Sequence, residues 1–264
     1  MRRYRVIPCL LLKGGGLYKT AKFKAPRYLG DPINVVRIFN DKEVDELILL
    51  DIAATTSGRD PDFAAIREIA QECFMPVCYG GGLRTTRQVE QVLRCGIEKV
   101  ALNAILTEAP AVVREASREF GASTIVAGID YKCNWLGKPQ VYIRAGQTAT
   151  GVGVREMAER AEELGAGEIL LNSIDRDGTM TGYDLEMVGA VAGAVGVPVI
   201  ACGGAATLHD FQKAIHVAGA SGVAAGSMFV FVGRQRGVLI TYPTQADLET
   251  QVFRAEQPER AASR

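Results

Sequence analysis

The feature that most constrains this chain is an alternation of strand-like and helix-like segments through most of its 264 residues. Short aliphatic runs, typical of buried parallel strands, recur eight times, at 5–12, 46–52, 76–79, 98–103, 123–130, 168–173, 197–202 and 221–226. Helical segments separate most of them, at 32–43, 62–73, 86–95, 108–120, 153–164, 184–194 and 208–218. Such alternation indicates parallel strands with right-handed crossovers. Eight units predict a closed (β/α)8 TIM barrel, with an open doubly wound sheet as the alternative.

The two halves of the chain resemble each other. The stretch Glu46–Asp51 aligns with Glu168–Ser173 at an offset of 122 residues, and Gly81-Gly82 aligns with Gly203-Gly204 at the same offset. A shared offset over several strands predicts a two-fold internal repeat of a four-strand half barrel. Equivalent loops of the two halves would then lie on opposite sides of one mouth.

The barrel is predicted to span residues 1–243. Residues 132–152 form a longer excursion after the fifth strand, and we expect a hairpin there. Residues 244–264 are predicted to form a C-terminal helix, capped by Thr244, and a frayed tail.

Composition excludes several classes of function. Lys+Arg and Asp+Glu number 30 each, so the overall field does not favour nucleic acid or an acidic membrane. Two histidines exclude a His-rich metal site, and the six cysteines include no C-x-x-C pair. We therefore expect no metal, no cofactor and no disulfide framework, in a reducing cytoplasm. Residues 187–206 carry no charge, but glycines and a proline divide them into a helix and a strand instead of a membrane span.

Glycine pairs follow two equivalent strands. Gly81-Gly82 and Gly203-Gly204 each precede a predicted helix, and Asn103-Ala104 and Gly226-Ser227 come one strand later. Glycine lets backbone N–H groups approach an anion, although tight turns also explain many such pairs. The predicted phosphate or ligand-binding residues are Gly81, Gly82, Asn103, Gly178, Gly203, Gly204, Gly226 and Ser227. Two sites across the mouth would suit a ligand charged at both ends.

Three carboxylates follow strands at the end where a barrel carries its active site. Asp130 ends the fifth strand directly after an apolar run, and we take it as the catalytic candidate. Asp51 ends the second strand and Asp177 follows the sixth, and each is a possible acid, base or orienting group. The alternatives are that Asp51 caps a turn and that Asp177 belongs to a tight turn.

Four charged residues stand at the opposite ends of strands. Arg5, Glu46, Lys99 and Glu168 each fall at the start of a strand, so two cations and two anions share one depth in the barrel. They could pair into a ring that gates the entry of a small molecule into the barrel, or they could be surface charges.

Several stretches resemble the cyclase subunit of imidazole glycerol-phosphate synthase: Arg5–Leu10, Gly80–Gly82, Glu168–Leu171, Ser173–Thr179 and Gly182–Asp184. The resemblance covers roughly residues 1–231. It implies a two-fold repeated barrel that forms a heterodimer with a glutaminase subunit docked at its bottom. Ammonia from the glutaminase would travel up the barrel to a phosphorylated small molecule at the top.

The resemblance also implies roles for particular residues. The four residues at the strand starts would be the ammonia gate, and the glycine pairs with Asn103 and Ser227 would hold phosphate. Residues 13–30, with Lys19 and Phe23, would form a flexible loop at the mouth.

Two departures from the family pattern change the expected chemistry. Where the family has an aspartate that partners the strand-five aspartate, this chain has Leu11, and residues 237–243 come before the last helix. A missing acid or base typically costs about 10²–10⁴ in rate. Both departures resemble a paralogous branch linked to surface-polysaccharide genes and acetamidino sugars.

Three functions follow as hypotheses. The barrel delivers ammonia for amidination of an activated acetamido sugar, with an ATP-dependent amidating enzyme as a further partner. Alternatively, it is an ordinary cyclase of histidine biosynthesis in which another residue replaces the lost aspartate. A third possibility is a non-catalytic scaffold that activates the glutaminase.

Overall fold

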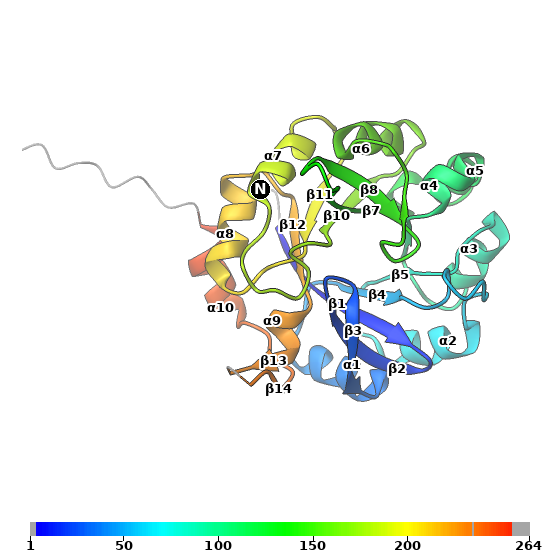
Figure 1. Ribbon diagram of the computed structural model, residues 1–264. Coiled ribbons are helices and arrows are strands. Elements are labelled where there is room, and N and C mark those ends of the chain that lie inside the picture. The colour runs from blue at the N-terminus through cyan, green and yellow to red at the C-terminus, as the bar shows by residue number, and fades with distance from the viewer. Residues whose placement is uncertain (1–3, 234, 255–264) are drawn as a thin grey trace, which may run out of the picture.

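The computed structural model describes residues 4–233 and 235–254, and Figure 1 shows a ring of helices around a central barrel. Eight parallel strands form the barrel: β1 (Arg5–Lys13), β4 (Leu47–Asp51), β5 (Val77–Gly80), β6 (Lys99–Leu102), β7 (Ile125–Cys133), β10 (Glu168–Ser173), β11 (Val199–Cys202) and β12 (Gly222–Ala225). They pair in chain order, and the β7–β10 and β12–β1 pairings close the sheet. The predicted (β/α)8 barrel is confirmed.

Seven main helices cover the outside of the barrel: α1 (Pro32–Asp41), α2 (Phe63–Glu72), α3 (Thr86–Leu93), α5 (Pro110–Phe120), α6 (Val154–Glu163), α7 (Leu185–Ala192) and α8 (Leu208–His216). Shorter helical pieces are α4 (Ile105–Glu108), η1 (Ala122–Thr124), α9 (Ser227–Val230), α10 (Gln245–Asp247) and η2 (Leu248–Phe253). Among the described residues, no helix has the length and apolar character needed to cross a membrane.

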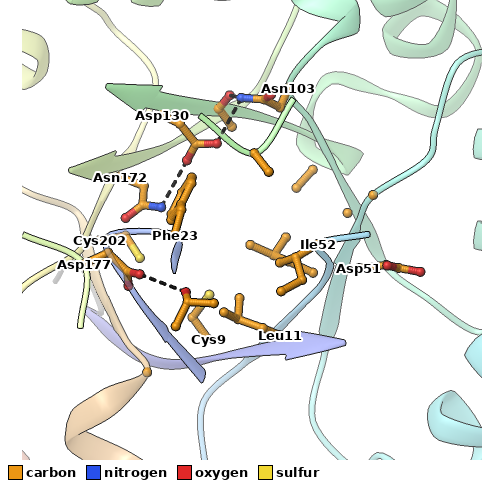
Figure 2. Close-up of a pocket in the computed structure, with 18 of the residues that line it drawn as sticks. Cys9, Leu11, Phe23, Asp51, Ile52, Asn103, Asp130, Asn172, Asp177 and Cys202 are labelled. Atoms are coloured by element: carbon orange, nitrogen blue, oxygen red, sulfur yellow. Dashed lines mark hydrogen bonds between the residues drawn. The ribbon is translucent and has the colours of Figure 1, made fainter. Parts of the chain in front are cut away.

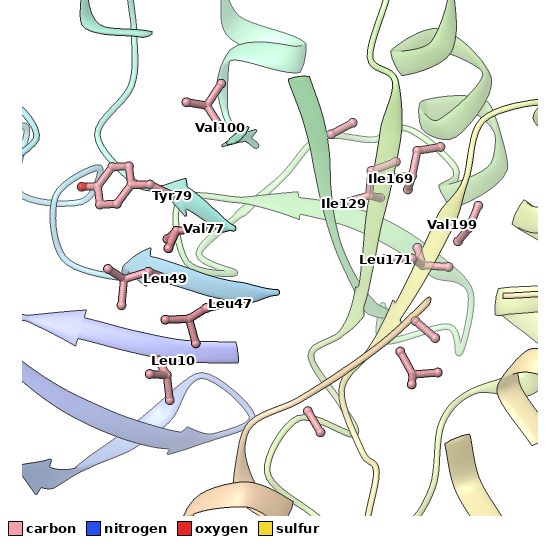
Figure 3. Packing of buried hydrophobic residues seen from close by; sticks show 14 of the residues in the cluster. Leu10, Leu47, Leu49, Val77, Tyr79, Val100, Ile129, Ile169, Leu171 and Val199 are labelled. Atoms are coloured by element: carbon pink, nitrogen blue, oxygen red, sulfur yellow. The ribbon is translucent and has the colours of Figure 1, made fainter. Parts of the chain in front are cut away.

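Two apolar layers hold this arrangement together. Side chains on the outer face of the strands pack against the helices, and Figure 3 shows Leu47, Leu49 and Ile169 in that layer. Alternate residues such as Ile7, Ile48 and Leu170 point inward and fill the barrel. This alternation explains why barrel strands read as continuous apolar runs.

The structure repeats its local geometry across the two halves. Gly81-Gly82 and Gly203-Gly204 all have positive φ, and both pairs press against the backbone of the preceding loop. The helices that follow begin with the same capping box, at Thr85 and at Thr207. A hairpin also follows the first strand of each half.

These hairpins lie at the mouth. In the second half, β7 continues into β8 (Pro139–Ile143) and β9 (Thr148–Ala149), as predicted for residues 132–152. In the first half, β2 (Gly16–Ala21) and β3 (Lys24–Gly30) pair antiparallel where a loop was expected over residues 13–30. Main-chain pairing with β1 ties this hairpin to the barrel, and the flexibility that the resemblance implies for it stays a prediction.

The C-terminal segment packs on the barrel. After β12 and α9, β13 (Phe231–Val232) and β14 (Gly237–Val238) form a small hairpin. The Tyr242 hydroxyl then donates to the carbonyl of Val6 at 2.8 Å, and Thr244 caps the helix that follows. The predicted frayed tail falls on residues 255–264, outside the described residues.

Candidate functional site

A cavity of about 380 Å³ opens at the C-terminal ends of the barrel strands. Its two sides differ in polarity, as Figure 2 shows. Asp130 and Asn172, on β7 and β10, make one side polar, whereas Leu11 and Leu50, on β1 and β4, make the other apolar. Most of the predicted site residues therefore gather at one mouth.

Asp130 is held by two amides. Its Oδ1 accepts a hydrogen bond from Asn172 Nδ2 at 3.0 Å, and its Oδ2 accepts one from Asn103 Nδ2 at 3.3 Å. Burial raises the pKa of Asp130 to about 7, the bond from Asn172 lowers it, and the charge of Asp177 raises it. A carboxyl group that titrates near neutrality can serve as an acid or as a base.

Asn172 was not singled out from the sequence. It occupies the position of Leu50 in the other half of the repeat, so a comparison of the two halves would have shown a polar residue in an apolar strand. The side chain is 8% exposed, and its Oδ1 has no hydrogen-bond partner.

The other two carboxylates have structural partners. Asp51 Oδ1 accepts hydrogen bonds from the backbone N–H groups of Ala53 and Ala54 at 2.9 and 3.0 Å, and Figure 2 shows its carboxylate turned away from Asp130. This is the geometry of a turn cap. Leu11 lines the cavity across from Asp130, and Figure 2 shows neither Asp51 nor Asp177 beside it.

Asp177 binds the hairpin of the first half. Its Oδ1 accepts from Lys19 Nζ at 2.7 Å, and its Oδ2 accepts from the Thr20 hydroxyl at 3.2 Å. Lys19 is 6% exposed, so the pair is sealed from solvent. A Cβ at Gly178 would lie 2.4 Å from the Thr20 carbonyl oxygen, which explains the glycine there. Asp177, Gly178 and Lys19 thus fix the β2–β3 hairpin over the cavity.

The two glycine loops and the residue pairs that come one strand later all line the cavity. Gly204 has φ of +114°, and a Cβ there would lie 2.2 Å from the Gly182 carbonyl oxygen. Gly226 lies beneath the Lys19 side chain, and the neighbouring Ser227 hydroxyl is buried without a hydrogen-bond partner. An unpaired buried hydroxyl is costly unless a ligand or a rearrangement satisfies it.

At the other end of the barrel, the four strand-start residues form a closed ring of ion pairs. Arg5 contacts both Glu46 and Glu168, and Lys99 Nζ lies 3.0 Å from Glu46 Oε1 and 2.9 Å from Glu168 Oε2. Burial lowers the pKa of Lys99, but the two carboxylates more than offset this, so the pKa is raised and Lys99 stays charged. The sequence-predicted ring residues therefore meet.

Small and apolar side chains fill the barrel between this ring and the cavity. They include Ile7, Cys78, Ala101 and Val126. Burial raises the pKa of the Cys78 thiol well above its usual value, so it stays protonated at neutral pH. Among the described residues, the side chains of this interior cluster between the two polar ends of the barrel are therefore uncharged.

The fold and the site define a TIM barrel protein with a cavity at the C-terminal ends of its strands. The family model described as "Histidine biosynthesis protein" matches residues 5–234, and the chain belongs to this family.

Curated relatives agree with this assignment. The "Putative imidazole glycerol phosphate synthase subunit hisF2" of Pseudomonas aeruginosa is 49% identical over 92% of this chain and 97% of its own length. The "Putative imidazole glycerol phosphate synthase subunit HisF" of Leptospira interrogans is 45% identical over 94% of this chain and 98% of its own. The "Imidazole glycerol phosphate synthase subunit HisF" of Streptomyces avermitilis is 43% identical over 86% of this chain and 90% of its own length. The chain is therefore HisF-like.

Proposed function

We propose that this barrel receives ammonia from a glutaminase partner at the ring end and delivers it to a phosphorylated ligand at the mouth. The observation that carries the proposal is a complete ring of ion pairs at one end of the barrel together with a mouth that Leu11 and Asp130 both line. The similarity to relatives named as imidazole glycerol phosphate synthase subunits supports a synthase subunit of this kind.

The ring would act as the gate. Four charges that satisfy one another leave no free buried charge, so the ring can close the base while the ion pairs remain intact. Ammonia is small and neutral, and it suits an uncharged interior such as the one above Lys99. Release of one cation from the ring would open the base of the barrel, and ammonia would pass farther up only where the packed side chains of the interior, such as Ile7 and Val126, move apart.

Asp130 would handle the proton at the mouth. With a pKa of about 7, it can give a proton to a leaving oxygen or accept one from the attacking nitrogen. Leu11 stands across the cavity and can do neither. A reaction that needs two carboxylates on opposite sides of the cavity is therefore disfavoured. Attack by ammonia needs only one acid–base group, which Asp130 would supply.

The acceptor in this proposal is a nucleotide-activated acetamido sugar, which amidination converts to an acetamidino sugar in surface-polysaccharide synthesis. This choice follows the branch resemblance of Leu11 and residues 237–243. An ATP-dependent enzyme would activate the amide oxygen as a leaving group, because ammonia does not displace it unaided. The glutaminase, this barrel and that enzyme would act together in the cytoplasm.

Complementation of a strain that lacks the histidine-pathway cyclase tests the proposal. We expect no growth without histidine when this chain is expressed, and partial growth at most from Leu11→Asp. Full rescue by the unaltered chain would contradict the amidination role and favour the second candidate, the imidazole glycerol phosphate synthase cyclase. The family match and the retained Asp130 favour that candidate.

A further inference from the structure

The two ends of the cavity offer different groups to an anion. At an offset of 123 residues, Ala104 stands where Ser227 stands, so a methyl group replaces the hydroxyl at the end built by Gly82 and Asn103. The Asn103 amide is already engaged, because its Nδ2 donates to the Gly128 carbonyl at 2.8 Å and to Asp130. Neither Asn103 nor Ala104 brings a free side-chain donor to this end.

Arg144 lies at the same end. It lines the cavity, and its Nε donates to Glu108 Oε1 at 2.7 Å. Glu108 ends α4, the short helix that begins directly after Ala104. The side chains of the pair are 47% and 36% exposed, and a pair this exposed contributes little to stability. Arg144 can therefore leave Glu108 for a bound anion at little cost.

Arg144 belongs to a turn at the mouth with a left-handed backbone. Arg144 and Ala145 have φ of +53° and +54° in the turn between β8 and β9, and Ala145 and Gln147 from this turn also line the cavity. Left-handed conformations are uncommon in residues other than glycine, and they cluster at functional sites.

Besides Arg144, two cations among the described residues line the cavity, and both contact residues on the β2–β3 side. Lys19 is bound to Asp177, and Lys13 Nζ lies 5.8 Å from the centre of the Tyr18 ring. Arg144 is thus the cation placed to serve the Gly82–Asn103 end.

We propose that Arg144 recognises the second anionic group of the ligand, by exchanging Glu108 for a two-point contact with an oxyanion at the Gly82–Asn103 end. The inference rests on the proposed function for the presence of a phosphorylated ligand. A guanidinium presents a planar fork of N–H donors that matches phosphate and carboxylate groups. The ligand class is therefore a small molecule with a phosphate at the Ser227 end and a second oxyanion at the Arg144 end.

Site-resolved titration of the full chain tests this. Inorganic phosphate is added to ¹⁵N-labelled protein, and the backbone N–H signals near Gly82 and Asn103 give one dissociation constant, while those near Gly204 and Ser227 give another. Arg144→Gln is expected to weaken binding at the first end about tenfold or more and to leave the second unchanged. A parallel titration with acetate shows whether the first end also takes a carboxylate.

Glu108→Gln separates recognition from a structural role. Both variants break the Arg144–Glu108 pair, but only Glu108→Gln keeps the cation and removes its competitor. We expect Glu108→Gln to tighten phosphate binding at the first end, up to about fivefold. Arg155→Gln is the control, because it breaks an exposed pair with Glu159 on α6 and should change neither constant.

Equal weakening by Arg144→Gln and Glu108→Gln would overturn the proposal, as would an unchanged constant in Arg144→Gln or the absence of phosphate binding at the first end. None of these results bears on ammonia transfer, which is tested at the ring and by complementation. A failure of the Arg144 proposal is therefore distinguishable from a failure of the proposed function.

Discussion

Replacement of Asp130 by asparagine should change how the stability of the protein depends on pH. In the folded chain the pKa of the Asp130 carboxyl is about 7, against an ordinary value of 3.8, so the carboxyl is mostly neutral below pH 7. A carboxyl group whose pKa is raised by folding stabilises the folded state below its unfolded pKa. That stability is lost as the pH rises toward 7. Asp130 therefore lowers the stability of the wild-type protein at pH 8 relative to pH 4.5.

The magnitude follows from the pKa displacement. The difference between 3.8 and about 7 is about three pH units, and each unit corresponds to about 1.4 kcal/mol, which sets an upper bound of about 4 kcal/mol. Because Asp130 faces an open cavity, water reduces the effect, and we expect about 2 kcal/mol between pH 4.5 and pH 8.

Urea unfolding at the two pH values gives the measurement. The quantity to compare is the difference in unfolding free energy between wild type and Asp130→Asn, because any pH-independent cost of fitting the asparagine amide beside Asn103 and Asn172 cancels. The unfolding free energy of Asp130→Asn, relative to that of the wild type, should rise by about 2 kcal/mol from pH 4.5 to pH 8. Asp41→Asn, an exposed carboxylate on α1, controls for the loss of one charge. Equal pH dependence in wild type and Asp130→Asn would refute the assignment of Asp130 as a neutral acid.

Two further predictions concern the ring and the loops. Lys99→Met leaves the two ring carboxylates with one cation between them, and the unfolding free energy should fall by about 3 kcal/mol in urea titration; a loss below about 1 kcal/mol would mean that the ring is not buried in solution. Gly204→Ala forces a Cβ to within 2.2 Å of the Gly182 carbonyl oxygen, so it should cost about 2–4 kcal/mol. Gly233→Ala, with a positive φ but open space, should cost only about 1 kcal/mol in the same assay.

Much of the architecture could be predicted because the two halves of the chain carry the same pattern of strands, glycines and helices. Aliphatic runs mark strands that are buried on both faces, and the offset of 122 residues that aligns the glycine pairs also aligns the capping boxes at Thr85 and Thr207. The ring could also be predicted, because charged residues at the starts of four barrel strands lie at the same level along the barrel axis.

What the sequence left open depends on contacts between distant segments. Nothing in the pattern of residues 13–30 shows that β2 pairs with β1 or that Lys19 meets Asp177, since both depend on how the hairpin folds back over the mouth. The direction of the Asp51 side chain depends on the turn after β4, which offers two N–H groups to it. The position of an aspartate at the end of a strand therefore does not show whether its carboxylate caps a turn or takes part in catalysis.

Isotope transfer tests the central claim most directly. The full chain, its glutaminase partner, the activating enzyme, ATP and a nucleotide-activated acetamido sugar are mixed with amide-¹⁵N glutamine and excess unlabelled ammonium, and the amidino nitrogen of the product is read by mass spectrometry. An enclosed route through the barrel predicts a product that keeps the glutamine label, and dilution of the label when Lys99→Met opens the ring. Complete mixing with the unlabelled pool in the wild-type complex would contradict the account.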